Sequence, residues 1–228
     1  MGSERGARVV ESYATLAREV LRRPATLGSV RLVVVDGPSG GGKTHFAGRL
    51  AAALREAGAQ VTLVQTDDLL DGWDDQFTFW PRLEVSVLGP LRAGRAGTYQ
   101  RYDWHRARFG EETVSVPPHG VVILEGVSAA RAEIRREATL SVFVTVPYDV
   151  GLARAVQRDG EALRPYLLRW QSRERPHFAA DRTAAHVDVV VAGAADISYD
   201  RQTHFVRVDA PADSEGGSVT SRRRDGKP

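Results

Sequence analysis

Residues 33–50 read VVVDGPSGGGKTHFAGRL, and this stretch decides the fold. A β-branched apolar run comes first, a glycine-rich turn follows, and an amphipathic segment then places Phe46, Leu50 and Leu54 on one helical face. The octet at 37–44, GPSGGGKT, matches the G-x-x-x-x-G-K-S/T pattern of a P-loop. Glycine is needed because backbone N–H groups must approach a polyphosphate closely, and side chains would obstruct them. The stretch therefore predicts a buried strand, a phosphate-binding turn and a helix whose positive end faces the phosphates.

The P-loop predicts a site for a nucleoside triphosphate and Mg²⁺. Lys43 is expected to reach the outer phosphates, and the Thr44 hydroxyl is expected to ligate the metal. Lys43 is one of two lysines against 29 arginines, which indicates a position that needs a compact ammonium group. The expected nucleotide-binding residues are Gly37, Ser39, Gly40, Gly41, Gly42, Lys43 and Thr44.

Strands and helices alternate along the chain, which predicts an α/β fold of the P-loop NTPase type in a single domain over residues 1–210. Helices between the strands favour a parallel sheet of about five strands, flanked by helices. The strands are expected at 30–35, 60–65, 121–124, 140–146 and 187–192, with a terminal candidate at 203–208. Helices are expected at 7–23, 43–57, 150–159 and 161–173, and the stretch at about 154–170 is expected to form a lid.

Two segments stand apart in composition. Residues 67–118 are less regular and hold three of the four tryptophans, and we expect them to form an inserted acceptor-binding segment over one end of the sheet. Residues 211–228 turn to Ser, Gly, Asp and Arg with little to bury, and we expect a disordered tail.

The composition excludes several classes of protein. The 228 residues carry a formal net charge of +2, too small an excess to predict binding to a nucleic-acid backbone. The chain has no cysteine, which excludes a Cys nucleophile, a disulfide and a Cys-ligated zinc. No apolar run approaches the ~18 residues of a membrane span and no secretory signal is evident, so the cytoplasm is the expected location. The expected partners are ATP and a small-molecule acceptor, with neither nucleic acid nor membrane, and a homo-oligomer is compatible with the sequence.

The motifs that are missing narrow the class of P-loop protein. A GTPase of the common kind reads guanine with Asn-Lys-x-Asp, and this chain contains no asparagine. The strand at 121–124 ends in Glu125 and Gly126, whereas a motor-type ATPase usually has Asp or Asp-Glu there. The His-Arg-Asp and Asp-Phe-Gly motifs of protein kinases do not occur. A small-molecule kinase remains.

A small-molecule kinase needs a carboxylate to receive the proton of the acceptor hydroxyl. Ligands of such sheets bind at the carboxyl ends of the strands, and the strand at 60–65 runs directly into Thr66, Asp67 and Asp68. We expect Asp67 to be the base, with Asp68 as the competitor. Glu125 ends another strand and is the expected second metal residue, acting on Mg²⁺ through water.

Four segments of the chain resemble the uridine kinase family, within the phosphoribulokinase and uridine kinase group. The resemblance runs from about residue 33 to residue 193. Its segments are the P-loop, QTDD at 65–68, YDW at 102–104 with ILEG at 123–126, and DVGLARAVQRD at 149–159. The resemblance implies ATP-dependent phosphorylation of the 5′-hydroxyl of a pyrimidine nucleoside, uridine or cytidine. It also implies that Asp67 is the base, that Glu125 stands near the magnesium, and that Tyr102, Asp103 and Trp104 line the nucleoside pocket.

The lid and the acceptor residues depart from the family pattern. The family's compact Arg-Gly-Arg is replaced by RDGEALR at 158–164, in which Arg164 is the candidate lid arginine that contacts substrate. Arg154 and Arg158 lie one helical turn apart as candidates to stabilise the transferring phosphoryl group, and we expect Arg158 in that role. Asp71 is the first candidate for the acceptor hydroxyls, with Asp74 and Asp75 as alternatives, and we expect Trp73 and Trp80 to be structural. Two other functions stay open: a kinase for another hydroxyl metabolite, such as pantothenate or a sugar phosphate, and a nucleotide-binding regulator with weak ATPase activity.

Overall fold

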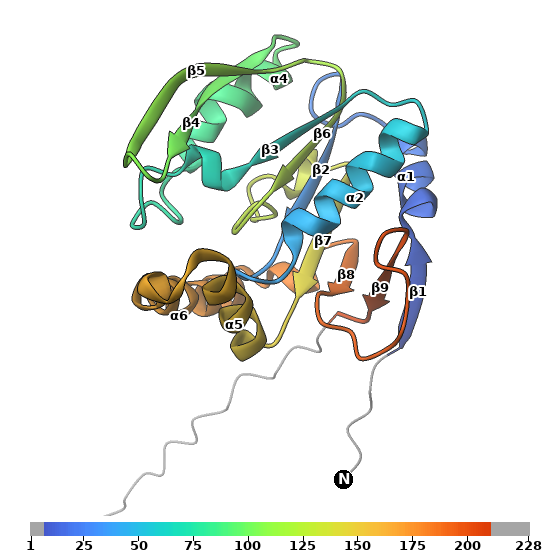
Figure 1. Ribbon diagram of the computed structural model, residues 1–228. Helices are drawn as coiled ribbons and strands as arrows, with labels where there is room; N and C mark the ends of the chain where they lie inside the picture. The colour runs from blue at the N-terminus through green and yellow to red at the C-terminus, as the bar shows by residue number, and fades with distance from the viewer. Residues whose placement is uncertain (1–6, 211–228) are drawn as a thin grey trace, which may run out of the picture.

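The computed structural model describes residues 7–210, so the tail expected at 211–228 lies outside the described residues. Within 7–210, seven strands form one sheet in the order β1-β9-β8-β7-β2-β6-β3 (Figure 1). The strands are β1 (Arg8–Ser12), β2 (Val30–Asp36), β3 (Val61–Gln65), β6 (Gly120–Glu125), β7 (Leu140–Thr145), β8 (Val189–Ala192) and β9 (His204–Val208).

The five strands expected from the apolar runs are confirmed, and they form the parallel part of the sheet. β2 lies at the centre and pairs in parallel with β6 and β7, while β3 and β8 extend the sheet on either side. Parallel strands are covered on both faces, so apolar side chains are needed at successive positions, as in the run at 32–35. The terminal candidate forms β9, which pairs antiparallel with β8.

The helix expected over 7–23 is wrong in its first part. Residues 8–12 form β1, which pairs antiparallel with β9 from Arg8 opposite Val208 to Ser12 opposite His204. Helix α1 (Tyr13–Arg22) begins where the Ser12 hydroxyl accepts a hydrogen bond from the Thr15 backbone N–H at 3.2 Å. The local helical spacing was overridden because the unpaired edge of β9 offers backbone hydrogen bonds to these residues.

Helices cover the sheet from two sides. α1 and α2 (Lys43–Glu56) pack on one face, where their buried side chains meet β2, β6 and β7. α5 (Tyr148–Asp159), the 3₁₀ turn η4 (Glu161–Leu163) and α6 (Arg164–Asp181) follow β7 and lie together at the lower left of Figure 1. Two further 3₁₀ turns are η3 (Arg135–Glu137) and η5 (Thr183–Ala185). No helix within residues 7–210 is long and apolar enough to cross a membrane.

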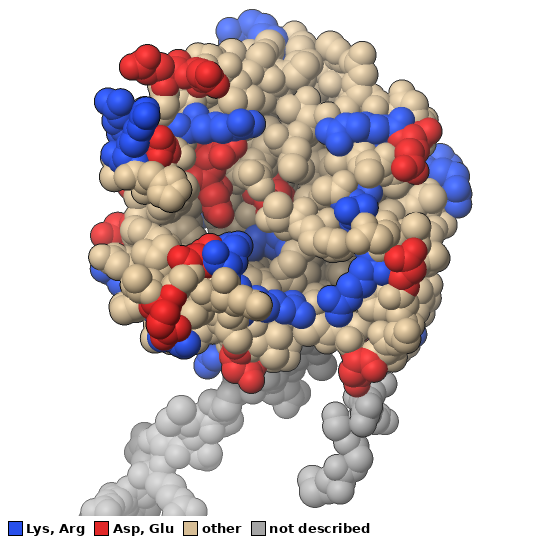
Figure 2. Space-filling model, in the orientation of Figure 1, with Lys and Arg blue, Asp and Glu red and all other residues tan. Residues whose placement is uncertain are grey.

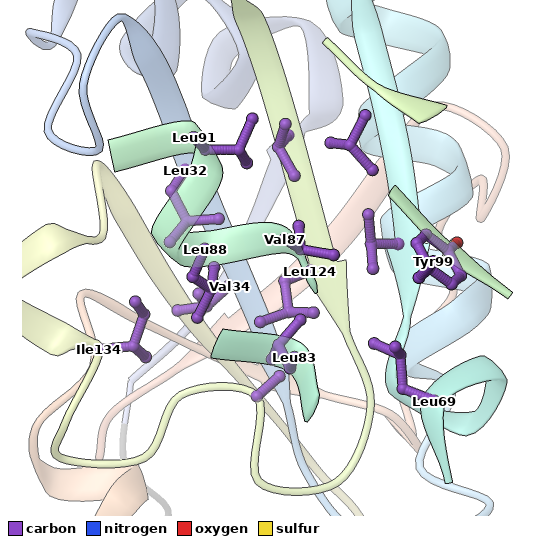
Figure 3. Packing of buried hydrophobic residues seen from close by; sticks show 14 of the residues in the cluster. Leu32, Val34, Leu69, Leu83, Val87, Leu88, Leu91, Tyr99, Leu124 and Ile134 are labelled. Atoms are coloured by element: carbon purple, nitrogen blue, oxygen red, sulfur yellow. The ribbon is translucent and has the colours of Figure 1, made fainter. Parts of the chain in front are cut away.

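The segment at 67–118 is more regular than expected. It contains the hairpin of β4 (Gly97–Asp103) and β5 (Arg108–Val116) and four short helical pieces: η1 (Thr66–Leu69), α3 (Trp80–Leu83), the π-helical turn η2 (Glu84–Leu88) and α4 (Gly89–Arg92). Figure 3 shows Leu83, Val87, Leu88 and Leu91 packed against Leu32, Val34 and Leu124 of the sheet. This segment therefore covers the second face of the sheet and contributes to the core.

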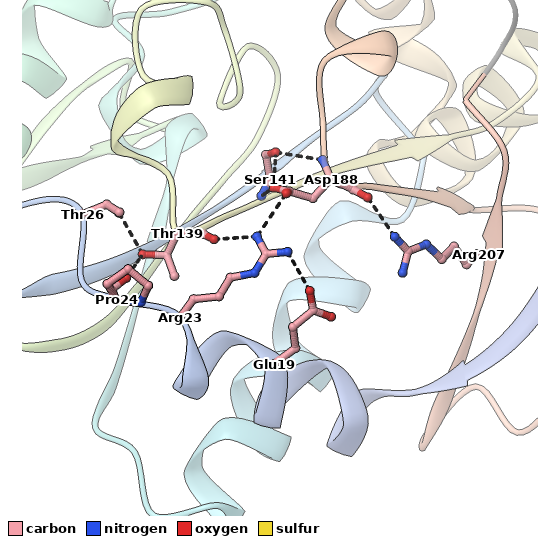
Figure 4. Close-up of polar contacts among 8 residues, drawn as sticks. All are labelled: Glu19, Arg23, Pro24, Thr26, Thr139, Ser141, Asp188 and Arg207. Atoms are coloured by element: carbon pink, nitrogen blue, oxygen red, sulfur yellow. Dashed lines mark hydrogen bonds and ion pairs between the residues drawn. The ribbon is translucent and has the colours of Figure 1, made fainter.

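A polar network joins α1 to β7 and β8 at the edge of the sheet opposite the P-loop (Figure 4). Arg23 donates to the Thr139 carbonyl at 2.8 Å and to the Asp188 carboxylate at 3.0 Å. Ser141 donates to the other Asp188 oxygen through its N–H at 2.8 Å and its hydroxyl at 2.7 Å. Burial raises the pKa of Asp188, but the hydrogen bonds from Ser141 and Arg23 outweigh it, so the pKa lies below its ordinary value.

Candidate active site

The P-loop connects β2 to α2 in a conformation that only glycine tolerates at two positions. Gly37 has a φ of 140°, and a Cβ there would lie 2.3 Å from the Val144 carbonyl oxygen. Gly40 has a φ of 71°, and a Cβ there would lie 2.0 Å from the Gly151 carbonyl oxygen. The loop thus packs directly on the backbone of β7 and of the first turn of α5.

The backbone donors of the P-loop divide into two groups. Gly37 donates to the Asp36 carboxylate, Ser39 to the Glu174 carboxylate and Gly41 to the Pro38 carbonyl, at 2.7, 3.1 and 3.0 Å. The remaining N–H groups have no hydrogen-bond partner within residues 7–210, and they belong to Gly40, Gly42, Lys43 and Thr44. The Lys43 ammonium donates to the Pro38 carbonyl at 3.1 Å. Free amides at a helix N-terminus beside an ammonium group form a cradle for phosphate.

Thr44 and Glu125 lie together at the carboxyl ends of the strands. The Thr44 hydroxyl donates to Glu125 Oε1 at 2.9 Å, and Gln65 of β3 donates its amide to the same oxygen at 2.8 Å. Glu125 is only 3% exposed, and within residues 7–210 its Oε2 accepts no hydrogen bond. The described residues contain no cluster of three or more acidic or histidine side chains arranged to hold a metal. A hydroxyl and one carboxylate suit Mg²⁺, which takes its other oxygens from phosphates and water.

Asp67 stands at the first turn of η1, directly after β3. Asp67 is exposed to a cavity of the protein. The protein atoms around the carboxylate displace water from it, and this desolvation raises the pKa of Asp67 to about 6. The positive charge of Lys43 opposes this rise, and the negative charge of Glu125 adds to it. Asp68 points elsewhere: it accepts hydrogen bonds from Arg101 at 3.1 Å and from Tyr99 at 3.3 Å and does not line the cavity. The geometry therefore favours Asp67 over its neighbour as a base.

One cavity of about 470 Å³ brings these groups together. Its lining residues come from the P-loop, the ends of β3 and β6, the segment at 67–118, and α5, η4 and α6. Figure 2 shows this face hollowed, with acidic side chains inside the hollow and basic side chains around it. The residues expected from the sequence that line the cavity are Ser39, Gly40, Lys43, Thr44, Asp67, Trp104, Glu125 and Arg158.

Comparison with known proteins gives the site its context. No protein-family model matches the chain. The uridine kinase of Histophilus somni is 26% identical over 182 residues, which cover 70% of this chain and 85% of that protein. The uridine kinase of Limosilactobacillus reuteri is 26% identical over 188 residues, 75% of this chain and 84% of that protein. The chain is a distant homologue of the uridine kinases.

A solved structure agrees on the fold. A protein described as a possible uridine kinase from Bacillus stearothermophilus superposes with a TM-score of 0.60 and 21% identity, and the match covers 78% of this chain and 96% of that one. The α/β architecture expected from the P-loop, with its mostly parallel sheet, is thus the P-loop kinase fold.

Four residues expected at the acceptor site of this uridine kinase homologue do not line the cavity. Asp71 lies in an exposed turn, where its N–H donates to Asp75 at 2.8 Å. Tyr102 is buried behind Trp104, with ring centroids 5.2 Å apart. Asp103 accepts the backbone N–H groups of the turn that follows it, and Arg164 pairs with Glu161 at the surface.

Three indole rings line the cavity instead, and we call them the aromatic wall: Trp73, Trp104 and Trp170. The Trp73 ring lies 5.2 Å from each of the other two, so Trp73 is a wall residue and not only a packing residue. The Trp104 indole N–H donates to the Asp67 carbonyl at 3.3 Å, and that of Trp170 donates to the Trp73 carbonyl at 2.5 Å. With these N–H groups occupied, the wall presents mainly apolar ring surface. His105, Leu163 and Leu167 complete this end of the cavity.

A second hollow of about 230 Å³ lies on the other side of the P-loop. It is lined by Gly40, Gly41 and Gly42 and by aromatic and basic side chains that include Tyr199, Arg154 and Arg201. Arg154 donates to the Gly193 carbonyl at 3.0 Å, so it faces this hollow and not Asp67. The phosphate cradle therefore has a cavity on each side, one with Asp67 and one without it.

Proposed function

We propose that this protein transfers the γ-phosphoryl group of ATP to a hydroxyl group of a small metabolite, and that the acceptor is the 5′-hydroxyl of a pyrimidine nucleoside, uridine or cytidine. One observation carries the proposal: a single cavity joins the phosphate cradle, the Asp67 carboxylate and the aromatic wall. The homology to uridine kinases supports the reaction type.

In this proposal, the triphosphate lies on the free amides of the P-loop, with Lys43 at its outer phosphates. The base of ATP occupies the hollow beside Tyr199 and Arg154, on the side of the loop away from Asp67. Thr44 and Glu125 would hold Mg²⁺, which neutralises charge on the phosphates when it is bound.

Asp67 accepts the proton of the acceptor hydroxyl while the oxygen forms a bond to the γ-phosphorus. The bond between that phosphorus and the β–γ bridging oxygen breaks, and ADP leaves. Arg158, which lines the same cavity, stabilises the charge on the transferring group together with Lys43. The raised pKa of Asp67 makes it a better proton acceptor near neutral pH than an ordinary carboxylate would be.

The aromatic wall favours a flat ring over a second phosphate. Its exposed surface is ring face and edge, and two of its three N–H groups are used within the protein. A nucleobase can stack on such rings, whereas the phosphate of a sugar phosphate would need cationic donors at this end. This contrast supports a nucleoside as the acceptor.

The region at about 154–170 is the proposed lid. Arg158, Leu163 and Leu167 line the cavity from α5, η4 and α6. Gly160 joins α5 to η4 with a φ of 97°, a backbone conformation available to glycine, and it is the proposed hinge. Closure would exclude water from the γ-phosphate and limit hydrolysis of ATP.

The test is ADP release with ATP and Mg²⁺ against a panel of nucleosides, pantothenate and sugar phosphates, with Lys43→Met as the inactive control. Strong stimulation by uridine or cytidine is expected. Stimulation only by pantothenate or a sugar phosphate would retain the kinase and refute the nucleoside. ATP binding with no stimulation by any acceptor would refute the kinase and favour a nucleotide-binding regulator.

A further inference from the structure

Glu174 is a fully buried carboxylate in the middle of α6, with 0% of its surface exposed. Both of its oxygens accept hydrogen bonds from one residue of the P-loop: the Ser39 N–H donates to Oε2 at 3.1 Å, and the Ser39 hydroxyl donates to Oε1. Glu174 makes no ion pair with any residue in 7–210. A buried carboxylate is rare without a cation, so its placement on the P-loop calls for a function.

Ser39 is where the P-loop needs a restraint. The three residues that follow it are glycines, which have no side chain to hold the chain in place. Ser39 passes between α5 and α6: a Cβ on Gly151 of α5 would lie 2.8 Å from the Ser39 carbonyl oxygen, while Glu174 of α6 accepts a hydrogen bond from the Ser39 N–H. The contact therefore fixes the peptide immediately before the first free amide, that of Gly40.

The same carboxylate also reaches the acceptor segment. The buried Gln76 side chain donates to Glu174 Oε1 at 3.3 Å and to the Trp170 carbonyl at 3.4 Å. Glu174 is thus the point at which the P-loop, α6 and the segment carrying Asp67 share hydrogen bonds.

We propose that Glu174 is a positioning residue, whose carboxylate holds Ser39 so that the amides of the phosphate cradle stay turned toward the triphosphate. The proposal deepens the proposed function and rests on its nucleotide-binding half alone, because the identity of the acceptor does not enter it.

The direction in which Glu174→Gln changes the affinity for ATP distinguishes a positioning role from a purely electrostatic one. Glu174→Gln keeps the size of the side chain, removes the negative charge and replaces one acceptor oxygen with an NH₂ group that faces donors. If Glu174 acted only through its charge, its removal would tighten the binding of an anionic triphosphate. If it positions Ser39, the loss of one charge-assisted hydrogen bond weakens ATP binding by about tenfold.

The experiment measures the Kd of ATP by calorimetry, without acceptor, for the full chain and its variants. Glu174→Gln and Ser39→Ala should both weaken binding, and the double variant should be weakened by less than the sum, because the two residues act through one contact. Asp181→Asn is the matched control: it lies on the same helix, its side chain is 13% exposed and it pairs with Arg135 away from the P-loop. It should lower Tm and leave the Kd of ATP unchanged.

Three outcomes would overturn the inference. The first is a Kd for Glu174→Gln equal to or tighter than that of the wild type. The second is equal weakening by Asp181→Asn at the same loss of Tm, which would make the effect one of general stability. The third is additive losses in the double variant. Failure of the wild type to bind ATP would instead refute the proposed function, so the two failures are distinguishable. If Glu174→Gln did not fold, Ser39→Ala would carry the test, and unchanged ATP binding would overturn the inference.

Discussion

Replacing Asp67 with asparagine is the sharpest test of the proposed chemistry. Asparagine keeps the shape of the side chain but cannot accept the proton of the acceptor hydroxyl. Loss of a general base typically lowers the rate by about 10²- to 10⁴-fold, so kcat should fall by that amount. ATP should still bind, because the free amides and Lys43 are unchanged and the variant removes a negative charge from the cavity.

The pKa of Asp67 adds a second, independent signature. With a pKa of about 6, the carboxylate is about 90% ionised at pH 7, and it takes up a proton as the pH falls. Because only the ionised form can act as the base, kcat/KM should be lost as the pH falls through 6, by about tenfold per pH unit below it. An ordinary aspartate would place this limb two units lower. The residual activity of Asp67→Asn should lack the limb altogether.

The assay is acceptor-stimulated ADP release from pH 5 to pH 9, with the Kd of ATP measured in parallel. Asp68→Asn is the matched control, since Asp68 pairs with Arg101 outside the cavity, and its kcat should stay within about threefold of the wild type. Phosphoryl transfer that survives in Asp67→Asn, or an acid limb that persists in it, would refute the assignment of the base.

Three further substitutions test the proposed metal residue, the aromatic wall and the stability of the fold. Glu125→Gln should raise the Mg²⁺ concentration for half-maximal activity by about ten- to a hundredfold, measured as ADP release in a magnesium titration; an unchanged titration would remove Glu125 from the metal site. Trp104→Ala should raise the KM for the nucleoside by about tenfold, since stacking on a base contributes about 1–3 kcal/mol. Trp104→Phe should retain most of the affinity, and neither variant should change the KM for ATP. Equal effects on the KM for the nucleoside and the KM for ATP would argue against stacking. Arg23→Ala should lower the free energy of unfolding by about 1–2 kcal/mol in urea denaturation, because Arg23 donates hydrogen bonds to Thr139 and Asp188. Arg22 is exposed, and Arg22→Ala should have little effect. Equal losses of stability in the two variants would show that the network adds nothing.

Much of the candidate site could be predicted because its residues adjoin strong local signals. Lys43 and Thr44 belong to the P-loop pattern itself. Glu125 ends the apolar strand β6, and Asp67 lies two residues after the end of β3. Because the carboxyl ends of parallel strands meet at one edge of a sheet, their meeting in one cavity follows from strand order.

Other residues escaped prediction because their positions depend on contacts between distant segments. Trp73 and Trp170 lie 97 residues apart and meet only because the segment at 67–118 packs against α6. Glu174 lies on the same helical face as the buried Leu167, Trp170 and Phe178, so its spacing indicates burial. That spacing does not indicate its partner, because Ser39 lies 135 residues away in the sequence. Asp71 and Arg164 suit the acceptor site by residue type, but Asp71 lies in an exposed turn and Arg164 pairs with Glu161.

The sequence by itself determined the P-loop and the parallel strands, because glycine spacing and apolar runs act over a few residues and allow few conformations. The tertiary structure alone decided that residues 8–12 are a strand, that 67–118 completes the core, and which side chains line the cavity. Those outcomes depend on pairing and packing between segments far apart in the chain, and the free energy of burying them together exceeds any local preference.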